Sequence, residues 1–243
     1  MGRVKSFLAA AALALAGAVG AAEPMYVTLT FDDGPKGNVT EVAPLLEKHG
    51  WRGTFNIVVD RVGRDDRHVT WDDVRELHRR GHEIASHTWT HPHLAKLYAA
   101  GATNRLHREI FEARDRLAKE VGVAPQFLCH PYCETTPEVD ALIRSAGLTP
   151  MGTRRYLMTS KSKPGKWAGA KATIERELGK KTRRPRAMDV LFHGTSPTSG
   201  GWEAMTGERD FEGLLDEIAA LEQEGRIKVV SYREFLDKVT AKD

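Results

Sequence analysis

The fold is decided by the stretch Met25-Tyr26-Val27-Thr28-Leu29-Thr30-Phe31-Asp32-Asp33-Gly34-Pro35. Its first six residues are apolar, aromatic or β-branched, which predicts a buried strand over 25–30. Gly34 and Pro35 then stop the strand directly after two adjacent carboxylates. Because neighbouring side chains of a strand point to opposite faces, Asp32 and Asp33 are able to share this strand end and serve different purposes.

Two carboxylates at a buried strand end are costly unless a metal or a proton compensates them. The alternative is an Asx turn in which one aspartate caps the backbone. Two histidines, His87 and His91, follow another short apolar segment within 81–91, and His193 ends an apolar run over 189–192. One carboxylate with two imidazoles suits zinc and leaves coordination positions open for water and substrate. Polar groups at successive strand ends are typical of the catalytic face of a β/α barrel.

Strand-like and helix-like segments alternate along the chain. The pattern predicts strands at 25–30, 54–58, 82–86, 126–129, 148–153, 189–192 and 227–230. It predicts helices at 38–49, 71–80, 103–121 and 137–146, and a further helix through the apolar stripe Phe211, Leu214, Leu215, Ile218 and Leu221. We expect Thr70 to cap the helix that begins at Trp71. This alternation indicates an α/β fold with about seven mostly parallel strands.

These motifs resemble those of the polysaccharide deacetylase family, also known as the NodB-homology domain or carbohydrate esterase family 4. The segment 30–35 resembles the first motif of that family, 86–91 the second, and Leu191-Phe192-His193 the last. The resemblance covers nearly all of residues 23–243. It implies a distorted (β/α) barrel of the NodB-homology type.

The resemblance also implies a metal centre. Asp33, His87 and His91 would bind Zn²⁺, or another divalent transition metal such as Co²⁺, and the metal-bound water would attack an acetamide carbonyl. Asp32 would be the general base, and His193 the general acid that protonates the departing amine. For His193 the alternative is an ordinary strand-end histidine bonded to the backbone.

Further roles follow from the same resemblance. The backbone N–H of Tyr132, after Pro131, would help to stabilise the oxyanion. Substrate-binding residues would be Pro131, Tyr132, Leu191 and Trp202. By residue type rather than by the resemblance, Trp202 and Trp89 would each offer an apolar platform for a sugar ring, and for each the alternative is core or loop packing.

The third motif departs from the common form of the family. Cys129 stands where an arginine usually orients the base, and Cys133 stands where glycine is usual. The Asp-rich fourth motif is not visible between Leu148 and Trp167. We consider His130 a candidate for a compensating role, whereas His93 is expected to pack or cap a loop. Cys129 and Cys133 are the two cysteines of the chain, and a disulfide between them and a pair of thiols remain alternatives.

Residues 1–22 are expected to be a signal peptide. Arg3 and Lys5 precede an Ala/Leu-rich run over 7–19, and small residues follow it. The run is shorter than the roughly 20 residues that a span needs, so we expect cleavage, no stable membrane span in 23–243, and an exported protein that is periplasmic or secreted.

Charge says little about partners, because the 36 Lys and Arg against 33 Asp and Glu give a net charge of +3. No nucleic-acid-binding motif is recognisable. The basic run over 161–186 either faces an anionic polymer or is a solvated surface.

The predicted function is therefore polysaccharide N-deacetylation, the hydrolysis of a carbon–nitrogen bond other than a peptide bond. The partner would be an acetylated N-acetylhexosamine polymer or oligomer, such as peptidoglycan, a chitin-like chain or an exopolysaccharide. Two alternatives remain: an O-acetyl esterase or small-amide hydrolase on the same scaffold, and a non-catalytic carbohydrate-binding descendant.

Overall fold

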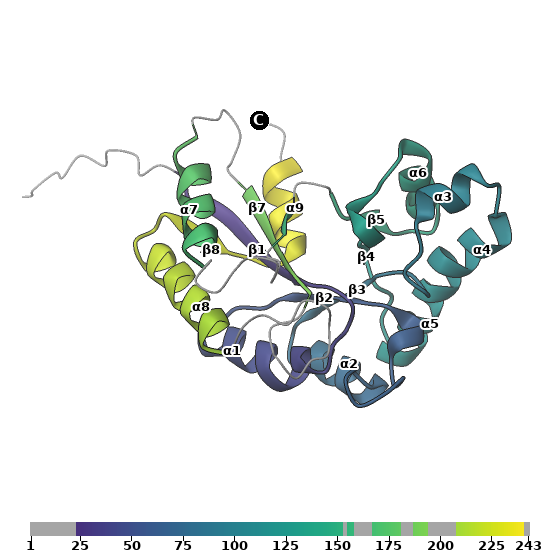
Figure 1. Ribbon diagram of the computed structural model, residues 1–243, viewed down its shortest axis with the longest axis horizontal. Coiled ribbons are helices and arrows are strands. Elements are labelled where there is room, and N and C mark those ends of the chain that lie inside the picture. Colours follow the sequence, from purple (N-terminus) through teal and green to yellow (C-terminus); the bar gives the residue numbers. More distant parts are fainter. Residues whose placement is uncertain (1–22, 153–154, 158–166, 181–186, 194–207, 241–243) are drawn as a thin grey trace, which may run out of the picture.

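The computed structural model describes residues 23–152, 155–157, 167–180, 187–193 and 208–240. One sheet of eight strands runs through these residues (Figure 1). The strands are β1 (Met25–Phe31), β2 (Thr54–Ile57), β3 (Glu83–Ser86), β4 (Phe127–Leu128), β5 (Thr149–Pro150), β6 (Arg155–Leu157), β7 (Ala187–Phe192) and β8 (Ile227–Val229). The strand order is β5-β4-β3-β2-β1-β7-β6, and β8 pairs with β1.

Strand β1 is the centre of the sheet, and every pairing between the named strands is parallel. On one edge, its residues from Tyr26 to Phe31 pair with β7. On the other edge its last residues pair with β2, and its first residues pair with β8. The stretch that organises the sequence therefore also organises the sheet.

The sheet is curled into a half-barrel. Its two edge strands, β5 and β6, follow one another in the chain, with only residues 151–154 between them. Five Cα–Cα steps span at most about 19 Å, so the end of β5 and the start of β6 lie within that distance of each other. The predicted distorted (β/α) barrel is confirmed. The sequence pattern missed β6, which contains only three residues.

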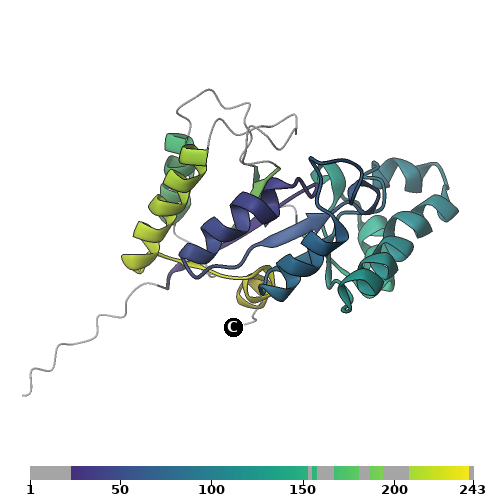
Figure 2. The same ribbon diagram turned by 90° about the horizontal axis from the view of Figure 1, so that it is seen from below.

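Most of the helices cover the outside of this sheet, and the last one packs against its inside (Figures 1 and 2). They are α1 (Ala43–Lys48), α2 (Trp71–Arg79), α3 (Leu94–Ala99), α4 (Thr103–His107), α5 (Ala113–Val121), α6 (Pro137–Ser145), α7 (Trp167–Leu178), α8 (Glu208–Gln223) and α9 (Tyr232–Thr240). Thr70 caps α2 as predicted, and it forms a reciprocal capping box with Asp73. The helix predicted over 103–121 is present as α4 and α5, joined by a π-helical turn at Arg108–Glu112.

The pleat of β1 separates the core from the site. Met25, Val27, Leu29 and Phe31 belong to the main core, together with apolar residues of α1, α2 and α8. The ring of Phe31 stacks on Phe55 of β2 and on Phe192 of β7, with centroids 5.2 and 5.1 Å apart. Since strand side chains alternate, Asp32 faces the inside of the half-barrel.

A second cluster fills the inside of the half-barrel. Helix α9 contributes Tyr232 and Phe235, which pack with residues of β1, β3 and β4 and with Cys129. In Figure 1 this helix lies between the β1 and the β4–β5 parts of the sheet. The concave side is therefore packed at one end, and the polar strand ends occupy the other.

Several expectations fall on residues outside the described ranges. These are the signal peptide at 1–22, Trp202, and the parts of the basic run other than 167–180. Among the described residues, no helix is long and apolar enough to cross a membrane.

Candidate active site

The polar side chains named above follow the carboxyl ends of adjacent parallel strands. Asp32 and Asp33 follow β1, His87 follows β3, and His193 follows β7. The Asp32 N–H donates to the Phe192 carbonyl at 2.8 Å, which continues the register of β1 and β7 by one residue. Because parallel neighbours lie about 4.8 Å apart, His193 is next to Asp32 at this edge of the sheet.

Asp33, His87 and His91 come together as one potential ligand set, which we call the imidazole site. The Asp33 Oδ1 atom lies 3.7 Å from His87 Nε2 and 3.6 Å from His91 Nε2. One ligand atom from each of the three residues lies within 4.8 Å of the others. In a tetrahedral zinc sphere, nitrogen and oxygen ligands are about 3.3 Å apart, so these distances are close to those of a bound cation.

The environment of His87 also fits a metal ligand. Its side chain is 1% exposed, and its Nδ1–H donates to the Cys129 carbonyl at 2.8 Å. This hydrogen bond leaves the lone pair on Nε2, and Nε2 is buried without a hydrogen-bond partner in the described residues. A ligating histidine typically has its second nitrogen held in this way. The residues present therefore fit a divalent cation.

The carboxylate of the imidazole site is paired with a cation, whereas burial keeps one of its histidines uncharged. Arg61, in the short helical turn Val59–Arg61, forms an ion pair with Asp33 Oδ1 at 2.7 Å. Burial lowers the pKa of His91 to about 4, the neighbouring His87 adds to this lowering, and Asp33 opposes it. His91 is therefore held in the neutral form, which is the form that binds a metal. Arg61 was not predicted as a site residue, because an arginine in a short polar segment is common on any protein surface.

Asp32 is 2% exposed and is held by neutral donors. The Asn56 amide nitrogen donates to Asp32 Oδ1 at 2.5 Å, and the Cys129 thiol lies 3.7 and 3.6 Å from the two carboxylate oxygens. His87 Nε2 is 3.6 Å from Asp32 Oδ2. Sequence reasoning missed Asn56. The signal available was an amide side chain between two apolar residues of the buried strand β2.

Backbone strain is concentrated at this edge of the sheet. The non-glycine residues with positive φ in the described ranges are Asp33 (76°), Thr88 (69°), His91 (63°), Tyr132 (61°) and Cys133 (56°). Such conformations cost about 1–3 kcal/mol each and persist where the surrounding structure enforces them. Gly34 also has a positive φ of 69°, and a Cβ there would lie 3.2 Å from Val69. This clustering is typical of functional sites.

A buried carboxylate holds the loop between His87 and His91. Glu109, on the π-helical turn, is 1% exposed. It accepts hydrogen bonds from the Trp89 N–H at 3.0 Å, the Thr90 N–H at 2.7 Å and the Thr90 hydroxyl at 2.6 Å. The His91 N–H donates to the Thr88 hydroxyl at 2.9 Å. Glu109 was not predicted as a site residue.

The residues expected to contact substrate differ in exposure. Tyr132 is 52% exposed, its ring stacks on His93 at 3.9 Å, and its hydroxyl donates to the His91 carbonyl at 3.3 Å. Pro131 and Leu191 are buried. Trp89 packs against the main core, with the Arg108 guanidinium 4.9 Å from its ring centroid. Tyr132 and His93 therefore form the exposed rim beside His91.

The structure shows the surroundings of the two cysteines and of His130 in the third motif. Cys129 is a buried thiol and Cys133 an exposed thiol, so the disulfide alternative is not formed. His130 places one ring nitrogen 2.8 Å from Asp140 and the other 3.2 Å from the Met151 carbonyl. Those contacts connect the end of β4 to α6 and to the end of β5. The contacts to Asp32 come from Cys129 and Asn56 instead.

Comparison with known proteins gives related enzymes. The family model for polysaccharide deacetylase matches residues 20–151, which is just over half of the chain. The chitooligosaccharide deacetylase of Rhizobium leguminosarum bv. trifolii is 31% identical over 207 residues, covering 82% of this chain and 86% of that protein. The chitin deacetylase of a Pestalotiopsis species is 33% identical over 112 residues, covering 46% of this chain and 36% of that protein.

The matches with the chitin deacetylases cover only part of those proteins, and the match with a solved structure has low sequence identity. The chain spans 36% and 43% of the length of the chitin deacetylases from Pestalotiopsis and Colletotrichum lindemuthianum that it matches. Among solved structures, a family 4 acetyl xylan esterase from Clostridium thermocellum, in complex with a cobalt ion, superposes with a TM-score of 0.64. That comparison has 22% identity and covers 87% of this chain and 90% of that one, so it supports the shared fold.

Proposed function

The chain belongs to the polysaccharide deacetylase family, and on that premise we propose that it is a metal-dependent hydrolase that removes N-acetyl groups. The substrate would be an N-acetylhexosamine polysaccharide or oligosaccharide of the peptidoglycan, chitin-like or exopolysaccharide type. The relatives named as deacetylases of chitin and chitooligosaccharides support this substrate class.

The imidazole site would hold the cation. Asp33, His87 and His91 supply one carboxylate and two neutral imidazoles, a donor set that suits Zn²⁺ or Co²⁺. A cation held there supplies Lewis acidity, which polarises the acetamide carbonyl and makes water a better nucleophile. Arg61 would move off Asp33 Oδ1 when a cation takes that oxygen, because both are positively charged.

Asp32 and His193 would move the proton. Asp32 would take it from the attacking water, held in place by the Asn56 amide and the Cys129 thiol. His193, which follows β7 at the position opposite Asp32 in the register of β1 and β7, would give a proton to the departing amine nitrogen. The two groups face the same side of the sheet, so one bound acetamide can reach both.

The remaining assignments concern the substrate. The Tyr132 N–H would stabilise the oxyanion, and the strained turn at Tyr132 beside His91 supports this. Pro131, Tyr132, Leu191 and Trp202 would line the substrate path. Of these, Tyr132 has the most exposed side chain among the described residues, and its ring offers a flat apolar face for a sugar.

One observation carries the proposal: Asp32, Asp33, His87, His91 and His193 follow three strands of one parallel sheet and end at one edge. The test is acetate release from N-acetylglucosamine oligomers, peptidoglycan, poly-N-acetylglucosamine and acetyl-xylan, with metal-free and zinc-loaded protein. We expect zinc-dependent release from an N-acetyl substrate. Release from acetyl-xylan alone would move the assignment to an O-acetyl esterase.

The base assignment has its own test. Asp32→Asn should retain stoichiometric zinc while acetate release falls about 10²–10⁴-fold, the usual contribution of general base catalysis. Asp66→Asn is the matched control, because Asp66 is exposed on a loop and its substitution should leave the rate unchanged. Undiminished release by Asp32→Asn would contradict the assignment of the base.

Export is part of the same proposal. Cleavage after residue 22 would release residues 23–243 as a periplasmic or secreted protein, where these polymers are found. The N-terminal sequence of the protein recovered from outside the cytoplasm would test this. A recovered chain that still begins with residues 1–22 would contradict it.

A further inference from the structure

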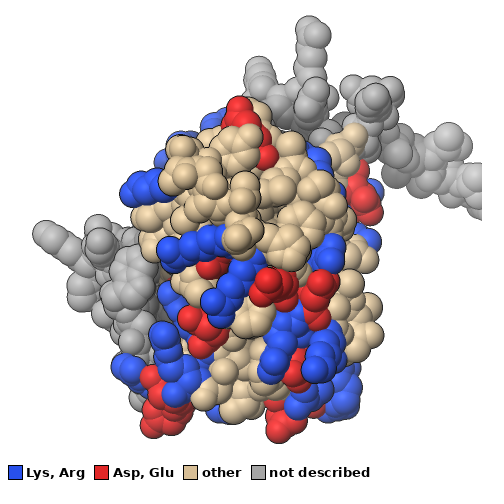
Figure 3. Space-filling view, turned by 90° about the vertical axis from the view of Figure 1, so that its right-hand side faces the viewer, with Lys and Arg blue, Asp and Glu red and all other residues tan. Residues whose placement is uncertain are grey.

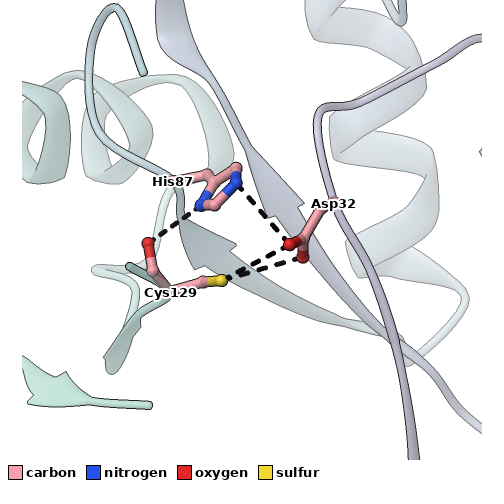
Figure 4. A group of neighbouring side chains, drawn as sticks. All are labelled: Asp32, His87 and Cys129. Atoms are coloured by element: carbon pink, nitrogen blue, oxygen red, sulfur yellow. Dashed lines mark hydrogen bonds and ion pairs between the residues drawn. The ribbon is translucent and has the colours of Figure 1, made fainter. Parts of the chain in front are cut away.

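A second set of potential metal ligands lies beside the imidazole site. Asp32, His87 and Cys129 face one another inside the half-barrel, and we call them the thiol site (Figure 4). The exposed fractions of Asp32, His87 and Cys129 are 2%, 1% and 0%. The nitrogen that points at Asp32 is again His87 Nε2, which has no hydrogen-bond partner among the described residues.

The distances within the thiol site match a metal coordination sphere. With metal–sulfur and metal–oxygen bonds of about 2.3 and 2.0 Å, tetrahedral sulfur and oxygen ligands are about 3.5 Å apart. The Cys129 Sγ lies 3.7 and 3.6 Å from the Asp32 oxygens. The His87 Nε2 to Asp32 Oδ2 distance is 3.6 Å, against about 3.3 Å in such a sphere. Small side-chain movements would close the site around a cation.

We propose that Asp32, His87 and Cys129 form a second binding site, for a thiophilic divalent cation such as Cd²⁺, that competes with the imidazole site. The single lone pair of His87 Nε2 serves one cation at a time, so the two sites exclude each other. On binding, the S–H bond of Cys129 breaks, its proton leaves to solvent, and a sulfur–metal bond forms. No electron is transferred.

Charge and ligand type favour the thiol site for soft cations. One thiolate and one carboxylate balance the two positive charges of the cation in a buried place, whereas the imidazole site has one carboxylate. The Asp33 carboxylate is also engaged by Arg61 at 2.7 Å. Thiolate ligands select soft metals, while imidazole and carboxylate suit zinc and harder ions.

The consequence rests on the proposed function, because a cation in the thiol site would ligate the base Asp32. Binding of a thiophilic cation would then stop acetate release, because it would occupy both the base and the His87 nitrogen that the imidazole site needs. The choice of site would decide whether a bound metal supports or blocks the reaction.

The test is a spectroscopic titration of the metal-free full chain with Cd²⁺ and with Co²⁺, following sulfur-to-metal charge-transfer absorbance. We expect one equivalent of Cd²⁺ to give the band in the wild-type protein. Cys129→Ser should abolish it, and His91→Ala, which removes only the imidazole site, should keep it. Cys133→Ser is the matched control, because Cys133 is the exposed thiol nearby, and it should also keep the band.

Three outcomes would overturn the inference: no band in the wild-type protein, a band that persists in Cys129→Ser, or a band that disappears in Cys133→Ser. Circular dichroism of Cys129→Ser would establish that it is folded, and the wild-type and His91→Ala titrations test the site without it. Acetate release by zinc-loaded wild-type protein is measured separately. A band without acetate release would contradict the proposed function alone, and acetate release without a band would contradict the thiol site alone.

Discussion

The Asp32 carboxylate contacts two uncharged groups, the amide of Asn56 and the thiol of Cys129. The two contacts differ in how strongly they hold the carboxylate in place. The Asn56 amide is the shorter contact, at 2.5 Å, and it comes from the neighbouring strand β2. A hydrogen bond to an ionised group contributes about 1.5–3 kcal/mol. In the absence of a cationic neighbour at the Cys129 position, this amide is the main fixed donor to Asp32 among the described contacts.

Asn56→Ala should therefore lower kcat about ten- to hundredfold and leave KM for the oligosaccharide and the zinc stoichiometry unchanged. The reason is that Asn56 contacts Asp32 and none of the three residues of the imidazole site. Steady-state kinetics and zinc analysis check this. Asn38→Ala is the matched control, since Asn38 is also a buried asparagine but lies on the turn Asn38–Val42. A rise in KM with kcat unchanged would instead make Asn56 a binding residue.

A second residue-scale prediction concerns Glu83, at the opposite end of β3. Burial raises its pKa to about 7, while Arg233 and the Thr54 hydroxyl, 3.4 Å away, act in the opposite direction. A raised carboxyl pKa means that the folded state prefers the protonated form. The contribution of Glu83 to the free energy of unfolding is therefore fully present below pH 4.5, the pKa of this carboxyl in the unfolded chain. It is lost as the pH rises to about 7, the pKa in the folded protein.

Glu83→Gln should remove this dependence. Between pH 4.5 and 7 the free energy of unfolding of the wild-type protein should fall relative to the variant by up to about 3 kcal/mol. Urea denaturation of both proteins across this range checks it. Parallel curves for the two proteins would contradict the raised pKa.

At the scale of elements, the loop 88–91 takes its shape from a helix that is distant in sequence. The π-helical turn Arg108–Glu112 presents Glu109 to two backbone N–H groups and one hydroxyl of the loop. Glu109→Ala should weaken zinc binding about 10–100-fold, the usual effect of losing an outer-shell contact. The dissociation constant measured by competition with a chelator checks this.

Glu112→Ala is the control for that experiment. Glu112 is on the same turn but is exposed, and its ion-pair partner is His107, 3.6 Å away. Its substitution should leave zinc affinity unchanged. Equal weakening by both substitutions would mean that general loosening of the turn, rather than the loop contact, sets the affinity.

The elements themselves were accessible from the sequence, but their irregularities were not. The periodic stripe through Leu106, Ile110 and Leu117 predicts a helix over 103–121, and the helix is there. Glu109 lies outside this apolar stripe, so the pattern predicts that its side chain is exposed to solvent. Its partners are backbone groups about 20 residues away, which have no signature in the sequence.

The same limit applies at the site. The convergence of Asp33, His87 and His91 follows from strand ends that share one edge, whereas their roles remain predictions. Cys129 was noticed as a departure from the family pattern, but its neighbours were not predictable. The register of β2, β3 and β4 decides that it lies against Asp32, and register depends on packing of the whole sheet.

For the whole molecule, a cation that binds only the folded chain adds to its stability. At a zinc concentration of 100 times the dissociation constant, the gain is about 2.7 kcal/mol. For a chain of this size that corresponds to a rise in Tm of about 5–10 °C. Calorimetry with and without zinc checks this. His87→Gln should abolish the rise, because His87 Nε2 belongs to both sites.

His93→Gln provides the matched control. His93 lies near the site, stacked on Tyr132 and 2.8 Å from Glu134, but it belongs to neither ligand set. The zinc-induced rise in Tm should persist in this variant. A rise that survives in His87→Gln would place the stabilising cation elsewhere on the molecule.

The surface offers little to steer a charged partner on the face over α3 to α6. Figure 3 shows Lys and Arg side chains interspersed with Asp and Glu over its lower half, and mainly uncharged residues above. Mixed charges of this kind give no strong field of one sign. This agrees with the small net charge of +3 of the whole chain.

The central position of β1 in the sheet has a consequence for folding during synthesis on the ribosome. Thr30 on β1 is hydrogen-bonded at 2.8 Å to Asp189 on β7, a partner 159 positions later in the chain. A ribosome that adds 5–20 residues per second leaves one edge of β1 without β7 for about 8–30 s. During that time the nascent chain carries an open strand edge that attracts chaperones or other chains. Asp32 and His193 meet only when that edge is filled, so the proposed pair of base and acid cannot form before β7 has been synthesised and has paired with β1.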